Sequence, residues 1–102
     1  MNRELIIDNY VIGDDNDCYV IAEVGHNHQG DMDICKQMFK TAKECGANAV
    51  KLQKRDNKGL FTKEILDSPY ANENSYGDTY GSHREALEFD RDQYLELIDY
   101  CR

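Results

Sequence analysis

The sequence lacks tryptophan, contains a single proline and has no apolar stretch near the roughly 20 residues that a membrane-spanning helix needs. Its first residues, 1–4, also lack the apolar centre of a signal peptide, so we expect a cytoplasmic protein with no membrane partner. Cations are scarce: 12 Lys and Arg oppose 20 Asp and Glu, giving a net charge of -8. This balance excludes nucleic acid as the expected partner, whereas an anionic small molecule needs only one or two local cations.

The four cysteines form no CxxC pair and no paired metal-ligand spacing; they are Cys18, Cys35, Cys45 and Cys101. We therefore expect reduced thiols that serve as small core residues, rather than a disulfide framework or a zinc site. The length of 102 residues corresponds to one small domain.

Apolar residues alternate with turn residues in the N-terminal half. Residues 5–7 and 10–12 flank Asp8 and Asn9, which predicts a β-hairpin, and the acidic residues 13–17 predict a solvated connector. Cys18 to Val24 then predicts a core strand, and Asn48 to Gln53 a second one. Between them lies a helix pattern that Asp31 caps and Gly46 ends, with an apolar stripe of Cys35, Met38, Phe39, Ala42 and Cys45. Strand, helix and strand in this order predict a parallel βαβ unit.

The pattern weakens over residues 54–89, a long connection with a short helix expected at Thr62 to Leu66. Asp90 then caps a final helix, with Gln93 at the capping-box position and an apolar stripe of Tyr94, Leu97, Ile98 and Cys101. The sequence reaches Arg102 within that stripe, with no further strand. We interpret the chain as a fragment that contains a second βα unit.

Candidate chemistry is concentrated where the strands end. Glu23 follows an apolar run and precedes a turn bounded by Gly25 and Gly30, while Lys51 and Gln53 share one face of the next strand. In an α/β barrel such side chains meet at the carboxyl ends of neighbouring strands. Two interpretations of Lys51 stand equally: it binds a phosphate or carboxylate, or it pairs with Glu23.

The turn also contains an HxH motif, His26 and His28, which is how metal-dependent hydrolases can begin. Because both histidines follow Gly25 and no third ligand is visible, we favour hydrogen-bonding or loop-packing roles over metal ligation. Further along, four residues could form a polar lid; alternatively, the aromatic ones cover a barrel rim and the arginine pairs with an acid. They are Tyr76, Tyr80, His83 and Arg84.

Four ordered motifs resemble the sialic acid synthase (N-acetylneuraminate synthase) family. They are IAEVGHNHQGD at 21–31, ANAVKLQK at 47–54, SPY at 68–70 and YGDTYGSHREALEF at 76–89. The resemblance covers most of the chain from Tyr19 to Cys101. It implies a (β/α)8 TIM barrel, of which residues 1–102 supply the N-terminal hairpin and the first two βα units. The remaining barrel and a C-terminal antifreeze-like domain would be absent.

The resemblance also implies a reaction: condensation of phosphoenolpyruvate with the open-chain aldehyde of N-acetylmannosamine or its 6-phosphate. A divalent metal, Mn²⁺ or Mg²⁺, is expected in the intact enzyme, with its ligands outside this chain and none within it. Related members make legionaminic or pseudaminic acid, and the intact enzyme is expected to be a homodimer in which the partner's small domain covers the active site.

By the same resemblance, Glu23 would contact the amino-sugar hydroxyls and help to manage protons at the reacting carbons. Lys51 would be a cation for phosphoenolpyruvate, Gln53 a polar positioner, and Asn27 a further substrate contact. We expect the isolated chain to be inactive. The alternatives are a non-catalytic module for sugar or phosphate binding or for assembly and, third, a metal-dependent hydrolase that uses His26 and His28.

Overall fold

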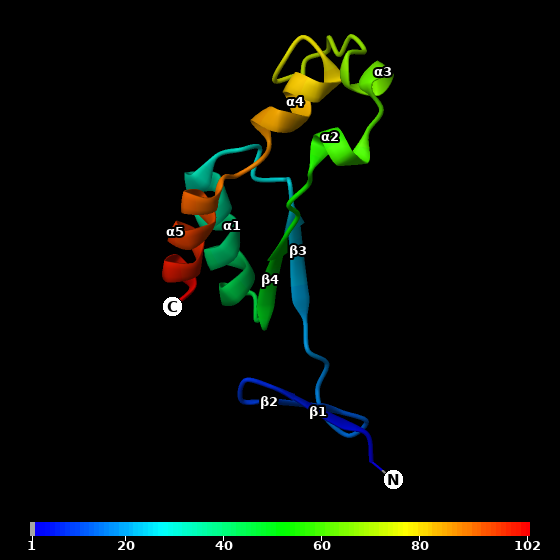
Figure 1. Cartoon of the computed structure of the whole chain (residues 1–102). Coiled ribbons are helices and arrows are strands. Elements are labelled where there is room, and N and C mark those ends of the chain that lie inside the picture. The colour runs from blue at the N-terminus through cyan, green and yellow to red at the C-terminus, as the bar shows by residue number, and fades with distance from the viewer. Residues whose placement is uncertain (1) are drawn as a thin grey trace.

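The computed structural model describes residues 2–102, so Met1, the first residue of the segment expected not to be a signal peptide, lies outside it. A βαβ unit occupies the middle, a hairpin lies beyond one end of its strands, and short helices gather beyond the other end (Figure 1). The radius of gyration is 17.5 Å. A compact domain of this length would have about 13 Å, so the described chain is elongated.

The hairpin is confirmed. Strands β1 (Glu4–Ile7) and β2 (Tyr10–Gly13) are antiparallel, with Ile7 opposite Tyr10. Asp8 in the turn has a φ of 50°, the left-handed conformation that aspartate tolerates better than most residues. The hairpin lies apart from the helices, and its apolar side chains, including Leu5 and Ile6, are exposed (Figure 1).

The βαβ unit is also confirmed. Strand β3 (Ile21–Gly25), helix α1 (Met32–Glu44) and strand β4 (Ala49–Leu52) follow one another, and the two strands are parallel. The Asp31 side chain accepts hydrogen bonds from two N–H groups in the first turn of α1. Gly46, just past the end of α1, has a φ of +93°, which explains why the helix stops there.

The predicted start of the first strand was wrong, because Cys18 to Val20 lie outside β3. The Val20 N–H donates to the Asn48 side-chain oxygen (2.8 Å) and the Val20 carbonyl accepts from the Asn48 N–H (2.9 Å). A side chain thus takes the place of a backbone partner, so no regular ladder extends back to Cys18. The second strand is likewise shorter than predicted, because Asn48 and Gln53 lie outside β4.

A small core lies between α1, the two strands and the last helix. Its buried members come from β3, α1 and the C-terminal segment; they are Val24, Cys35, Phe39, Phe89 and Leu97. Only one cysteine fits the prediction of core thiols: Cys35 is buried, whereas Cys18, Cys45 and Cys101 are exposed. Cys45 is exposed because it caps the end of α1. All four thiols are free, and burial raises the pKa of Cys35 to about 11.

Residues 54–89 contain more structure than the sequence predicted. Helix α3 (Lys63–Leu66) confirms the expected short helix, with Thr62 as its cap. Helices α2 (Asn57–Leu60) and α4 (Tyr80–Ala86) were not predicted. The capping box between Thr79 and Ser82 at the start of α4 was a signal that could have revealed it.

The last helix, α5 (Arg91–Cys101), begins at Asp90 with the predicted capping box to Gln93. Its apolar stripe was predicted too broadly. Leu97 is buried and Tyr94 packs against the core, but Ile98 is 49% exposed and Cys101 is exposed as well. The reason is that α5 packs on α1 along one side only (Figure 1). None of the helices within residues 2–102 has the length and apolar character needed to cross a membrane.

Two glycines provide a test of the turn that follows β3. Both have positive φ, +75° at Gly30 and +93° at Gly46, so alanine at either position carries about 1–2 kcal/mol of backbone strain. A Cβ at Gly30 would also lie 2.3 Å from the Ala86 carbonyl oxygen, whereas one at Gly46 meets no atom within 4 Å. We expect Gly30→Ala to lower the free energy of unfolding clearly more than the matched control Gly46→Ala, measured by urea denaturation. Equal losses would contradict the close packing of α4 on the turn.

Candidate functional site

The strand pair has one covered face and one uncovered face. Val24, Val50 and Leu52 pack into or against the core beside α1. Because side chains alternate along a strand, Glu23 and Lys51 face the opposite way, and the two residues are direct partners in the parallel register. The predicted pairing of strand faces therefore brings a carboxylate and an ammonium together near the carboxyl ends of β3 and β4.

Glu23 and Lys51 form an ion pair. The Lys51 Nζ donates to the Glu23 Oε2 at 2.6 Å, and the side chains are 54% and 47% exposed, respectively. Of the two interpretations of Lys51, the ion pair is thus confirmed, while its role toward an anion stays a prediction. A pair this open to solvent contributes at most about 1 kcal/mol to stability. The ammonium also has two further N–H groups with which it can bind an anion.

Asn27 lies in the turn after β3, near Gly25. Its Nδ2 donates to the Val24 carbonyl (2.8 Å), which holds the side chain back over Gly25. A Cβ on Gly25, whose φ is +57°, would lie 3.3 Å from the Glu23 Oε1 and 4.0 Å from the Asn27 Nδ2. The missing side chain at Gly25 therefore leaves space beside both the carboxylate and the amide. The predicted contact of Asn27 with a substrate stays a prediction.

Gln53 lies beyond the end of β4 and contacts other partners than the ion pair. Its side-chain oxygen accepts from the Arg55 guanidinium (3.0 Å), and its backbone carbonyl accepts from the Tyr94 hydroxyl (3.3 Å). The strand pattern that would align Gln53 with Lys51 stops at Leu52. Its role as a polar positioner stays a prediction.

His28 has the loop-packing role that the sequence favoured. It is 1% exposed, its Nδ1 accepts from the Gly30 N–H (2.9 Å), and its ring stacks on Phe89 with centroids 4.0 Å apart. Burial, helped by the nearby His26, lowers the pKa of His28, so the ring is neutral at physiological pH. Within residues 2–102 no group of three His, Cys, Asp or Glu side chains is arranged so that it could hold a metal ion. The hydrolase alternative gains no ligand set from this part of the chain.

The four residues of the suggested lid do gather. The Tyr76 N–H donates to the His83 Nδ1 (3.2 Å), and the Tyr76 hydroxyl reaches Gln29 in the turn after β3 (2.9 Å). Arg84 does not pair with an acid among the described residues, so that part of the alternative was wrong, while the covering of a barrel rim by the aromatic residues stays a prediction. The Arg84 guanidinium instead donates to the Tyr80 hydroxyl (3.0 Å) and lies over the ring of Tyr80.

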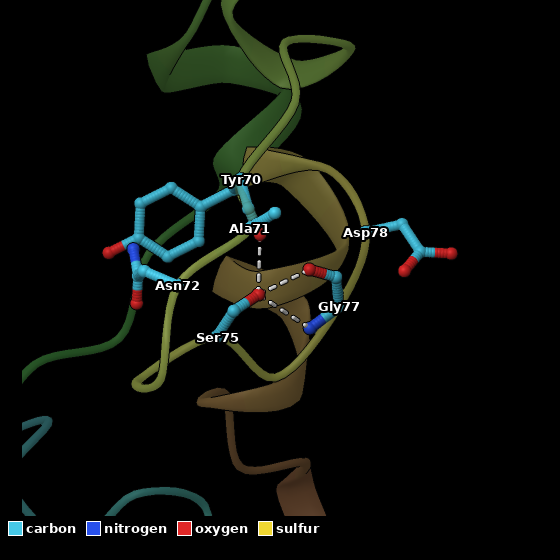
Figure 2. Close-up of a pocket in the computed structure, with 6 residues that line it drawn as sticks. All are labelled: Tyr70, Ala71, Asn72, Ser75, Gly77 and Asp78. Carbon is cyan, nitrogen blue, oxygen red and sulfur yellow. Dashed lines mark hydrogen bonds between the residues drawn. The ribbon is translucent and has the colours of Figure 1, made fainter.

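A surface hollow lies in the loop before α4, away from the Glu23–Lys51 pair. Figure 2 shows its six lining residues, which are Tyr70, Ala71, Asn72, Ser75, Gly77 and Asp78. The Ser75 hydroxyl donates to the Tyr70 carbonyl (2.6 Å) and accepts from the Gly77 N–H (3.4 Å). These internal bonds shape the loop, and the Asp78 carboxylate points outward from them (Figure 2). The hollow contains none of the candidate site residues, which lie at the ends of the strands.

The contacts of Glu88 could not be predicted from the sequence. This side chain is 6% exposed and lies 3.2 Å from the His26 Nε2 and 3.0 Å from the Lys54 Nζ. Its partners are 33 or more residues away in the chain, so no local spacing could reveal them. Glu88 thus adds a buried carboxylate beside the turn that follows β3, close to the strand ends that carry the candidate site.

The comparisons with known proteins agree on one family. The model of the NeuB family matches residues 38–102. The N-acetylneuraminate-9-phosphate synthase of Mus musculus is 47% identical over 89% of this chain, and that of Drosophila melanogaster is 46% identical over 82%. The chain spans about a quarter of the length of these relatives, 25% and 23% respectively.

A solved structure supports the same conclusion. The N-acetylneuraminic acid (sialic acid) synthetase of Leptospira borgpetersenii aligns with 98% of this chain and 30% of its own, with a TM-score of 0.71 and 25% sequence identity. The mixed α/β fold expected from the sequence is therefore confirmed.

The lowered pKa of His28 predicts a pH dependence. The unfolded chain takes up the proton near pH 6.5 while the folded chain resists it, so stability is full above pH 6.5 and falls as the pH drops below it. We expect the free energy of unfolding to decrease between pH 7.5 and 5.5, and this decrease to be smaller in His28→Phe, which keeps an aromatic ring against Phe89. Urea titrations at both pH values measure it. The control Gln29→Ala, at an exposed position, should show the same decrease in the free energy of unfolding as the wild type. If His28→Phe also showed the full decrease, the His28 ring would not be its cause.

Proposed function

Since this chain belongs to the NeuB family, we propose that it forms part of the active site of an enzyme that makes a sialic acid or a related nonulosonate. The substrates would be phosphoenolpyruvate and an N-acyl amino sugar, N-acetylmannosamine or its 6-phosphate. The observation that carries the proposal is the Glu23–Lys51 pair, which lies on the uncovered face near the carboxyl ends of two parallel strands. High identity to two N-acetylneuraminate-9-phosphate synthases supports it.

We further propose that these residues begin a (β/α)8 barrel. The parallel strands β3 and β4, with α1 on one face, have the arrangement of a first repeat, and α5 would be the helix of the second repeat. In such a barrel the face that carries Glu23 and Lys51 points inward. The carboxyl ends of the strands are then the place where substrates bind.

In the proposed reaction the enol carbon of phosphoenolpyruvate attacks the aldehyde carbon of the sugar, and the aldehyde oxygen becomes a hydroxyl by gaining a proton. Water adds to the resulting cationic carbon and loses a proton, and the bond from this carbon to the phosphate oxygen then breaks, so that phosphate leaves and a ketone forms. Lys51 would attract the carboxylate or phosphate of phosphoenolpyruvate with the N–H groups that Glu23 does not use. Glu23, an acceptor when ionised, would bind the sugar hydroxyls and hold a proton near the reacting carbons.

A divalent metal, Mn²⁺ or Mg²⁺, remains an expectation for the intact enzyme. The residues described here do not fit such an ion, because no group of three potential ligands converges among them and the Nδ1 of His28 already accepts a hydrogen bond. The homodimer and the cytoplasmic location likewise stay predictions.

The test uses the full-length protein that contains this chain, supplied with phosphoenolpyruvate, N-acetylmannosamine or its 6-phosphate, and Mn²⁺. We expect formation of a sialic acid and release of phosphate, and a fall in kcat/KM of about 100-fold or more in Lys51→Ala and in Glu23→Gln, as for loss of a preorganised charge in other active sites.

A second ion pair of the chain provides the control. Lys36 and Glu96 are 2.7 Å apart and join α1 to α5, on the covered side of the strands. Lys36→Ala and Glu96→Gln should change kcat/KM by no more than roughly twofold. If the Lys51 and Glu23 variants behaved like these controls, the proposed site would be wrong. Saturable binding of phosphoenolpyruvate without turnover in the wild type, measured by calorimetry, would favour the binding-module alternative.

A further inference from the structure

Glu88 lies in the short link between α4 and α5, and groups from two separate segments converge on its carboxylate. His26, in the turn after β3, places its Nε2 3.2 Å from the Glu88 Oε1. From the segment after β4, the Lys54 Nζ donates to the Oε2 at 3.0 Å and the Arg55 N–H donates to the same oxygen at 3.3 Å. One buried side chain therefore connects the segments that follow both strands.

The spacing along the chain relates this cluster to the proposed site. His26 is three residues after Glu23, and Lys54 is three residues after Lys51. Glu23 and Lys51 are opposite each other in the strand register. Just beyond the strand ends, Glu88 contacts both of the segments that follow β3 and β4. The relative position of the two strand ends, and so of the two charges, is fixed from both sides.

The carboxylate is nearly sealed from solvent while one of its partners is open. Glu88 and His26 are 6% and 9% exposed, whereas Lys54 is 56% exposed. The His26 ring lies within ion-pair distance of Glu88 but is not aligned for a hydrogen bond, and both ring nitrogens and the Glu88 Oε1 have no hydrogen-bond partner among residues 2–102. The hydrogen bonds from the Lys54 Nζ and the Arg55 N–H are thus the ones that hold the Glu88 carboxylate. A buried charge that loses such a partner is costly, so the contact is a firm link.

Further contacts extend the link. The His28 ring meets His26 edge to face, with centroids 5.9 Å apart, and stacks on Phe89, the neighbour of Glu88. Tyr94, whose pKa is raised by burial and then by Glu88, donates its hydroxyl to the backbone of Gln53. Both segments are therefore held by the C-terminal part of the chain.

We propose that Glu88 is a positioning residue for the Glu23–Lys51 pair: by binding Lys54 and Arg55 on one side and contacting His26 on the other, it sets the geometry between the two strand ends. This inference rests on the proposed function. It predicts that loss of the Glu88 charge misaligns the reacting groups without removing any group that touches substrate.

The kinetic test compares Glu88→Gln with Glu96→Gln in the full-length protein. Glu88→Gln keeps the shape of the side chain and an oxygen for the Arg55 N–H, but loses the charge that binds Lys54. We expect kcat to fall about tenfold, because small misplacements of reacting groups are expensive, with KM for phosphoenolpyruvate changed less than about twofold. The folded fraction, from circular dichroism, corrects each value. A corrected kcat equal to that of Glu96→Gln would overturn the proposal.

A pair of variants at Lys54 approaches the cluster from the exposed side, where folding is less at risk. Lys54→Met removes the cation and Lys54→Arg keeps it. We expect kcat to fall in the first and to return to within about twofold of the wild type in the second. An equal fall in both would show that side-chain shape, and not the ion pair with Glu88, matters, and would contradict the proposed link.

Hydrogen exchange separates this inference from the proposed function, since it needs no activity. In Glu88→Gln the backbone amides of residues 25–30 and 53–57 should both exchange faster than in the wild type, while Glu96→Gln should leave both segments unchanged. If the wild type made no sialic acid, the proposed function would fail while this measurement still decides whether Glu88 links the segments. Unchanged exchange in either segment would overturn the link.

Discussion

The burial of one face of the β3–β4 pair by α1 is the constraint on which the rest of the described structure depends. Val24, Cys35 and Phe39 form its centre, and Phe89 and Leu97 complete it from the C-terminal segment. Burying apolar side chains on one face sends the alternate side chains to the other. The position of Glu23 opposite Lys51 follows from the burial of the other face and from the parallel register. The packing of the core therefore also determines the geometry of the candidate site.

The turn after β3 determines the surroundings of Glu23 at the end of the strand. Gly25 leaves space beside the Glu23 carboxylate, and Gly30 lets the turn approach the Ala86 carbonyl at the end of α4. His28 fills the interior of the turn by stacking on Phe89. A segment more than fifty residues further along the chain thus supports the turn from behind. The polar side chains of the turn are held by packing rather than by the turn sequence alone.

The sequence predicted those features whose cause is local. The hairpin, the βαβ unit, the Asp31 cap and the capping box at Asp90 all follow from periodicity and from side chains within a few residues of one another. It failed where a distant group decides. Asn48 replaces a strand partner at Val20, and the limited cover of α5 leaves Ile98 exposed. The role of Glu88 was missed for the same reason, since its partners are on other segments.

The two ion pairs near the strand ends differ in a way that matters for chemistry. Glu23 and Lys51 are about half exposed, so their attraction adds little to stability, and a β-branched residue at position 51 would suit a strand better. Stability therefore does not account for this pair, whereas a ligand that enters from solvent could share its charges. Glu88, by contrast, is buried, and its carboxylate depends on the hydrogen bonds from Lys54 and the Arg55 N–H. An exposed pair of charges, with a buried carboxylate linking the segments that follow both strands, would suit the binding of an anionic substrate in a fixed orientation.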